Sequence, residues 1–187
     1  DRIGGKGWEN TKSRARAKAH EVARDLVELY AKREKSEGFA FPKDGEAQRE
    51  FEAAFEWEPT PDQAQAAEAG KRDMEKKIPM DRLVCGDVGF GKTEVAMRLA
   101  FKAVSANKQV ALLVPTTLLA AQHYQSFVDR FSGWPVRIEL LNRYRTPREK
   151  KRVLEELASG AVDIVVGTHA LLSDKVKFKE LGLLVID

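Results

Sequence analysis

The chain has 187 residues, of which 43% are hydrophobic and 33% charged, and its formal net charge is +3. This length suits one domain with an appended arm, and the composition excludes a collagen, a coiled-coil rod and a wholly disordered chain. So small a net charge does not require a nucleic-acid partner, so such a function has to rest on local patches. The single cysteine, Cys85, excludes an internal disulfide, and a reducing compartment such as the cytoplasm is expected. Every apolar run is far shorter than the ~18 residues of a membrane helix, so no membrane contact is expected.

The first third of the chain has the pattern of a helical arm. Residues 1–10 carry Gly4, Gly5 and Gly7 and are expected to form a flexible lead-in. Helices are expected over residues 13–35, 44–56 and 60–77, and the second should turn Phe51 and Phe55 inward. The third begins with Thr60-Pro61-Asp62-Gln63, which has the spacing of a capping box. We place a boundary between a helical linker, residues 1–58, and a core, residues 59–187.

After Pro79, short apolar runs alternate with helical stretches, which is typical of a parallel sheet covered by helices. The expected strands are residues 82–85, 109–114, 136–141, 163–166 and 183–186. The expected helices are residues 92–105, 117–131 and 147–158, and the last begins with a second capping box, from Thr146 to Glu149. The fold class is therefore α/β, with a parallel sheet, helices on both faces and an N-terminal helical arm.

The strongest signal follows the first expected strand. The sequence Gly86-Asp87-Val88-Gly89-Phe90-Gly91-Lys92-Thr93 matches the phosphate-binding pattern G-x-x-x-x-G-K-[ST] in full. Glycines let the backbone curl so that its N–H groups face an anion, and the helix that starts near Lys92 adds its positive end. Lys92 is expected to reach the β- and γ-phosphates of a nucleotide, and the Thr93 hydroxyl to hold Mg²⁺. Glu94, in the first helical turn, is expected only to favour the helix dipole.

Asp187 is the second candidate ligand for Mg²⁺, because it directly follows the apolar run of residues 183–186. Ligands of open α/β sheets bind at the carboxyl ends of strands, where the phosphate loop and Asp187 should both lie. Lys92 and Asp187 are therefore the candidate catalytic residues. Two other hypotheses remain open at this point: a P-loop small-molecule kinase, and a non-enzymatic polymerase-docking module with a vestigial phosphate loop.

Three further segments resemble a known family. The segment Pro115-Thr116-Thr117-Leu118-Leu119-Ala120-Ala121-Gln122-His123 resembles motif Ia of superfamily 2 helicases of the RecG type, and Gly167-Thr168-His169-Ala170-Leu171-Leu172 resembles the DNA-contacting motif that follows it. Residues 131–139, with Arg143-Tyr144-Arg145 after them, are similar to the family of bacterial transcription-repair coupling factors, translocases related to RecG. The resemblance extends from Trp8 to Asp187. It implies a RecA-like P-loop NTPase lobe, truncated after the aspartate of motif II and preceded by linker helices.

The resemblance also implies roles for single residues. Gln63 matches a glutamine that reads the edge of adenine, a role that is compatible with capping-box partnership. Phe55 or Trp57 would pack on the adenine ring, with core packing as the alternative. The positions that would touch the DNA backbone are Thr116, Thr117, Gly167, Thr168 and His169, although a threonine at 116 or 117 could instead cap the next helix. Arg143 and Arg145 are expected to contact DNA phosphates, whereas the basic residues from 148 to 152 are expected to form a solvated helix face.

The family implies an ATP-driven double-stranded DNA translocase that acts on stalled RNA polymerase and couples transcription to DNA repair. Contacts with RNA polymerase and with excision-repair proteins would be made by parts outside this chain. The family's motif II reads Asp-Glu-Glu-His, and of these residues this sequence has the aspartate, Asp187. We therefore expect the 187-residue chain to bind ATP and Mg²⁺ but not to turn ATP over, because phosphoryl transfer needs the second lobe as well.

Overall fold

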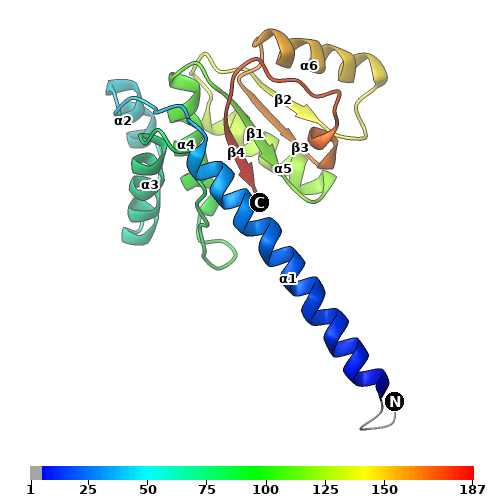
Figure 1. The fold of residues 1–187 in the computed structure, drawn as a ribbon. Coiled ribbons are helices and arrows are strands. Elements are labelled where there is room, and N and C mark those ends of the chain that lie inside the picture. Colours follow the sequence, from blue (N-terminus) through cyan, green and yellow to red (C-terminus); the bar gives the residue numbers. More distant parts are fainter. Residues whose placement is uncertain (1–5) are drawn as a thin grey trace.

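The protein is an α/β body from which one long helix projects (Figure 1). The computed structural model describes residues 6–187. The projecting helix, α1 (Lys6–Lys35), begins before the expected residue 13. The expected flexible lead-in is wrong for residues 6–10, which are helical, because one glycine in a first turn costs only about 1 kcal/mol and no proline interrupts the segment. Residues 1–5 of that lead-in lie outside the described residues.

The apolar side chains of α1 remain in solvent. Val22, Leu26, Leu29 and Tyr30 lie on this helix and are all exposed. Near its end, Arg33 forms an ion pair with Asp81, which ties the helix to the body. None of the helices in residues 6–187 combines the length and the apolar character that a membrane span would need.

Three helices form a group beside the sheet: α2 (Glu46–Ala53), α3 (Pro61–Met74) and α4 (Lys92–Ser105). The first two are shorter than expected, since α2 ends before Phe55 and α3 ends before Lys77. The capping box at the start of α3 is confirmed, because Thr60 and Gln63 exchange both of its hydrogen bonds. Helices α3 and α4 pack so closely that a Cβ at Gly70 would lie 2.8 Å from a methyl carbon of Leu99.

The sheet has four parallel strands in the order β2-β3-β1-β4. Their bounds are β1 (Gln109–Leu113), β2 (Ile138–Leu141), β3 (Ile164–Gly167) and β4 (Leu181–Ile186). The connecting helices are α5 (Thr117–Arg130), α6 (Pro147–Ser159) and the short 3-10 helix η1 (His169–Leu172). The four strands, α5 and α6 agree with the expected elements to within about two residues, whereas η1 is not among them.

Helices cover both faces of the sheet, as expected. On one face, Val110 and Leu112 of β1 pack in a core with Phe101 of α4 and Phe127 of α5. On the other face, Ala111 packs in a second core that includes the apolar side of α6. This alternation is the period of two that a strand imposes on its side chains. The α/β fold class is thus confirmed.

The arm and the core share packing. Phe51 of α2 is fully buried, as predicted, and its ring stacks on that of Phe101 with centroids 4.1 Å apart. Phe55, in contrast, lies beyond the end of α2 and is half-buried. The chain from about Phe41 onward therefore contributes to the same core as α4 and α5.

The predicted strand at residues 82–85 is wrong. The segment is irregular, and its Leu83 is 86% exposed. A strand exists only where a neighbouring strand supplies hydrogen bonds, and apolar composition cannot replace that partner. Within residues 6–187, β4 pairs with β1 along one edge and no ladder joins its other edge to residues 82–85.

Candidate nucleotide-binding site

The predicted phosphate loop connects the irregular segment before it to the start of α4. Two of its glycines, Gly89 and Gly91, have φ angles of 85° and 69°, in the left-handed region that glycine adopts without strain. Gly91 is the N-cap of α4, so the first helical residue is Lys92. The loop itself lies on the surface, where Val88 is almost fully exposed.

The ammonium group of Lys92 is held by the loop. Its Nζ donates to the carbonyl oxygens of Gly86 at 2.7 Å and Asp87 at 2.8 Å. The methylene stem of Lys92 also lies against Gly86, whose ideal Cβ would be 3.6 Å from it. The lysine is therefore held by the backbone of the loop for which the sequence predicts phosphate binding.

A cleft of about 1070 Å³ opens beside this loop. The loop residues that line it are Val88, Gly89, Gly91, Lys92 and Thr93. The other walls are residues 54–57, one side of α5, and Asp187 directly after β4. The structure therefore brings together Lys92, Thr93 and Asp187, the three residues for which the sequence predicts the chemistry. Gly86, Asp87 and Phe90 shape the loop without lining the cleft.

Asp187 has a partner that the sequence analysis does not single out. Nε2 of His123, on α5, lies 2.7 Å from a carboxylate oxygen of Asp187. The backbone N–H of Asp187 donates to the carbonyl of Leu113 at 3.0 Å, which continues the β1–β4 ladder by one residue. His123 thus holds the carboxylate, and the strand ladder holds the backbone of Asp187, at the rim of the sheet. His123 lies in the motif Ia segment of the sequence. Because 64 residues separate it from Asp187, its position there does not indicate the contact between the two side chains.

Gln63 lies between the start of α3 and the phosphate loop. Its Oε1 accepts a hydrogen bond from the backbone N–H of Thr60 at 2.9 Å, and its Nε2 donates to the carbonyl of Phe90 at 2.9 Å. The capping role predicted for Gln63 is therefore confirmed. The same side chain bonds to the loop but is not among the residues that line the cleft, so the adenine-reading role stays a prediction.

Phe55 and Trp57 are the two candidates for packing on a base. Both line the cleft, but they are held by their surroundings to different degrees. Phe55 is half-buried, and the guanidinium groups of Arg98 and Arg130 lie 5.7 Å and 5.4 Å from its ring centroid. Trp57 is 71% exposed. Phe55 is thus the more firmly held of the two.

The topology gathers the predicted DNA-contacting segments at one rim of the sheet. Leu113 is in register with both Gly167 and Ile186, and Gly167 is in register with Leu141, so the carboxyl ends of all four strands align. The segments that follow these ends hold the remaining predicted positions: Thr116, Thr117, Arg143, Arg145, Thr168, His169 and Asp187. The rim is the place where the general rule for open α/β sheets puts a ligand.

These positions are not equally available to a ligand. Gly167 and Thr168 are buried, whereas His169 is exposed. The Thr116 hydroxyl caps α5 by accepting from the backbone N–H of Leu119 at 3.2 Å, which confirms the capping alternative. Arg143 is exposed, while Arg145 is half-buried and donates to Glu149 at 3.1 Å.

The rim segments after β1 and β2 touch each other. Arg143 donates to the hydroxyl of Tyr144 at 3.0 Å. This hydrogen bond, joined by one from the Thr117 side chain, holds the pKa of the Tyr144 hydroxyl below its usual value. Arg143 and Thr117, both predicted to contact DNA, therefore lie near the same tyrosine hydroxyl.

A parallel sheet with a phosphate loop and an aspartate at its carboxyl rim defines a P-loop nucleotide-binding lobe. The chain belongs to the DEAD/DEAH box helicase family, whose profile matches residues 60–187. It is 55% identical over 186 residues to the transcription-repair-coupling factor of Escherichia coli (strain K12), and 53% identical to that of Bacillus subtilis (strain 168). Each alignment covers 100% of this chain and 16% of the relative.

A solved structure of RecG bound to a three-way DNA junction has the same fold. It superposes with a TM-score of 0.79 at 38% sequence identity, covering 84% of this chain and 22% of that one. The predicted resemblance to RecG-type helicases and to transcription-repair coupling factors is therefore confirmed. Membership of a helicase family favours a motor protein over the kinase and docking-module hypotheses.

Proposed function

We propose that this chain is the ATP-binding first motor lobe, residues 59–187, with linker helices, residues 1–58, of an ATP-driven double-stranded DNA translocase. The observation that carries the proposal is that Lys92, Thr93 and Asp187 line one cleft. The names of its relatives indicate a coupling of transcription to repair, and the translocase would bring this about by acting on stalled RNA polymerase. The chain spans about a sixth of the length of those relatives, so this activity belongs to the proposal.

The residues present fit ATP with Mg²⁺. The curve of the loop holds the Lys92 ammonium where phosphate oxygens would lie, and Thr93 and Asp187 offer two oxygen ligands on the same cleft. Mg²⁺ typically takes one or two carboxylates together with substrate phosphates and water. The metal would neutralise charge on the phosphates, while Lys92 orients them and Gln63 with Phe55 or Trp57 contacts the base.

Double-stranded DNA would contact the rim of the sheet. Arg143 and His169 are exposed there, and Thr117 and Arg145 lie beside them. Contacts of this kind bind the phosphate backbone without reading bases, as a translocase requires. RNA polymerase and excision-repair proteins would bind parts of the protein outside residues 1–187. Because bacterial DNA lies in the cytoplasm, this is where the protein would act.

Nucleotide binding to the 187-residue chain tests the proposal directly. In the presence of Mg²⁺, ATP should raise the unfolding temperature, and calorimetry should give an affinity that falls at least about tenfold in Lys92→Ala. The matched control is Lys151→Ala, which removes an exposed lysine on α6, away from the cleft, and should leave ATP affinity unchanged. Equal ATP binding by the wild type and Lys92→Ala would contradict the proposed site.

A further inference from the structure

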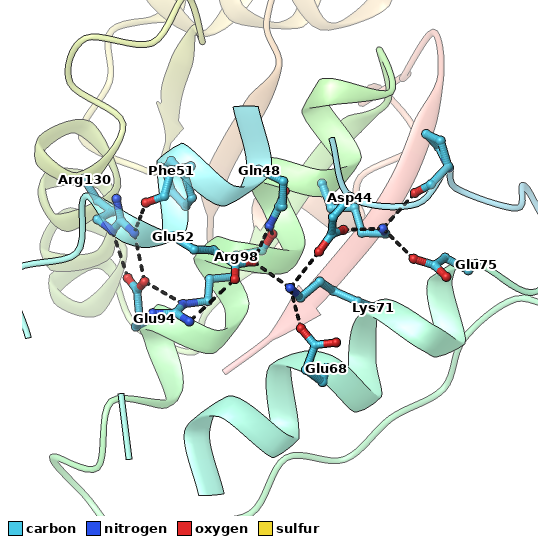
Figure 2. A network of polar contacts seen from close by, with 12 residues as sticks. Asp44, Gln48, Phe51, Glu52, Glu68, Lys71, Glu75, Glu94, Arg98 and Arg130 are labelled. Carbon is cyan, nitrogen blue, oxygen red and sulfur yellow. Dashed lines mark hydrogen bonds and ion pairs between the residues drawn. The ribbon is translucent and has the colours of Figure 1, made fainter. Parts of the chain in front are cut away.

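Arg130, the last residue of α5, joins the walls of the cleft. Its side chain is 12% exposed. Its Nε and Nη2 donate to the two carboxylate oxygens of Glu94, each at 3.0 Å, and Nη2 also donates to the backbone carbonyl of Phe51 at 2.8 Å. Figure 2 shows this guanidinium between Glu94 on one side and Phe51 on the other.

Glu94 connects Arg130 to the phosphate loop. It lies two residues after Lys92, in the first turn of α4, and its side chain is only 8% exposed. Besides Arg130, its Oε1 accepts from Nε of Arg98 at 2.9 Å. The carboxylate is therefore fully engaged by two arginines, which is more than the dipole role that its sequence position predicts. Because Arg98 would still hold Glu94 if Arg130 were replaced, we expect the turn that carries Lys92 and Thr93 to keep its place.

Phe51 connects Arg130 to the opposite wall. Its carbonyl is among the last four of α2, which have no partner within the helix, and Arg130 satisfies it. The guanidinium also lies 3.9 Å from the centroid of the Phe51 ring and 5.4 Å from that of Phe55. Arg130 thus fixes the point where the chain leaves α2 and enters residues 54–57, the wall that carries Phe55 and Trp57.

We propose that Arg130, aligned by Glu94, is a positioning residue that holds the base-binding wall, residues 54–57, at a fixed place relative to the phosphate loop. This inference rests on the proposed ATP site and adds the means by which base and triphosphate are bound in register. The ligand class is a purine nucleoside triphosphate, whose flat base would stack on an aromatic side chain of this wall. Arg130 contributes to recognition of the base, because it touches the wall and the start of α4 but not the loop itself.

The test compares ATP with inorganic tripolyphosphate, both with Mg²⁺, by calorimetry on the 187-residue chain. Arg130→Met keeps an unbranched side chain that can pack on Phe51 but removes every donor. ATP affinity should fall about tenfold, the scale of stacking one base on an aromatic ring, while tripolyphosphate affinity should change less than twofold. Arg130→Lys keeps the charge but cannot form the bidentate pair. Its ratio of ATP affinity to tripolyphosphate affinity should therefore lie between those of the wild type and Arg130→Met. Lys102→Met, which removes a buried cation of the same network that does not line the cleft, should leave the ratio unchanged.

An unchanged ratio in either folded Arg130 variant would overturn the inference, as would equal losses for both ligands. If Arg130→Met does not fold, Arg130→Lys decides by the same criterion. Hydrogen exchange of the wild type provides a test without a variant: ATP should protect residues 51–57 more than tripolyphosphate does, and equal protection would overturn the inference. If wild-type binding of both ligands is insensitive to Lys92→Ala, the proposed site itself is wrong. If binding depends on Lys92 but the ratio of ATP to tripolyphosphate affinity is the same in the Arg130 variants as in the wild type, only the inference about Arg130 is wrong.

Discussion

Two regions of the molecule are built from many ion pairs, yet they use them differently. The first, which we call the buried network, lies where α2, α3 and α4 meet the end of α5. Its cations are Lys71, Arg98 and Arg130, which Figure 2 labels, and Lys102. The second, which we call the α6 region, is residues 137–156, where Arg137, Arg145 and Arg152 surround Glu139. The cationic side chains are 3–12% exposed in the buried network and 26–52% exposed in the α6 region.

The difference in exposure decides what each set of charges can do. In the buried network the cations are largely enclosed and fix helices to one another, and of the four only Arg130 lines the cleft. Burial by itself raises the pKa of Asp44, but hydrogen bonds from Lys102 and Lys71 outweigh it and hold that pKa below its usual value. In the α6 region it is the anion, Glu139, that is buried, while its arginines remain accessible to a phosphate backbone.

The largest effect is expected from breaking the buried network. Lys102→Met removes the partner of Asp44 and Glu75 and of the Pro42 carbonyl, all contacted within 2.9 Å, and should lower the free energy of unfolding by about 3 kcal/mol. The matched change in the α6 region, Arg152→Met, should cost about 0.5 kcal/mol or less, because this side chain is half exposed and Glu139 keeps two other arginines. Urea unfolding measures both values. Similar losses for the two variants would abolish the distinction between the regions.

DNA binding tests the second half of the comparison, the accessibility of the arginines in the α6 region. In the longer protein, Arg143→Gln should weaken binding to all DNA sequences alike and lower the slope of log affinity against log salt by about 1, as loss of one phosphate contact does. Arg145→Gln should have a smaller effect, because Glu139 and Glu149 already engage that side chain. Fluorescence anisotropy at several salt concentrations provides the slopes. A loss that varied with DNA sequence would argue against backbone contact.

The smallest expected effect concerns acid stability in the α6 region. Hydrogen bonds from the Thr146 hydroxyl and backbone N–H, together with Arg145, lower the pKa of Glu149 from its usual 4.5 to about 2. A carboxylate with a lowered pKa contributes its stability above about pH 4.5 and loses it as the pH falls toward 2. The stability advantage of the wild type over Glu149→Gln should therefore be full at pH 5 and shrink steadily toward pH 2. Thermal unfolding of both proteins across this range measures it, and a difference independent of pH would contradict the assignment.

Much of this organisation could be predicted from the sequence, because it depends on local chemistry. The capping boxes at Thr60 and Thr146 need residues only three positions apart, and both are present in the structure. The phosphate loop is likewise a short pattern, and the alternation of strands and helices identifies the α/β fold. The sequence also predicts that Lys92 and Asp187 lie near each other, and both line one cleft although no strand precedes the loop in the described residues.

The rest depends on contacts between distant parts of the chain. Glu94 and Arg130 are 36 residues apart, and nothing in their local sequence indicates that they pair. The segment at residues 82–85 shows the opposite case, in which a local apolar pattern predicts a strand but no neighbouring strand joins it within the described residues. The unpredicted ion pair and the wrongly predicted strand have the same cause: packing partners from elsewhere in the chain, rather than local propensity, decide which structure forms.

The lysine of the phosphate loop has consequences for which anions can enter. Its ammonium has three N–H donors, of which two already bond to carbonyl oxygens, so a polyphosphate that uses more than one donor must exchange with the loop's own backbone. The net free energy of that exchange is the difference between two sets of hydrogen bonds, which is much smaller than either set alone. A monovalent anion such as chloride gains too little to drive that exchange, whereas several phosphate oxygens acting together can. We therefore expect the loop to favour anions that present several oxygens over chloride.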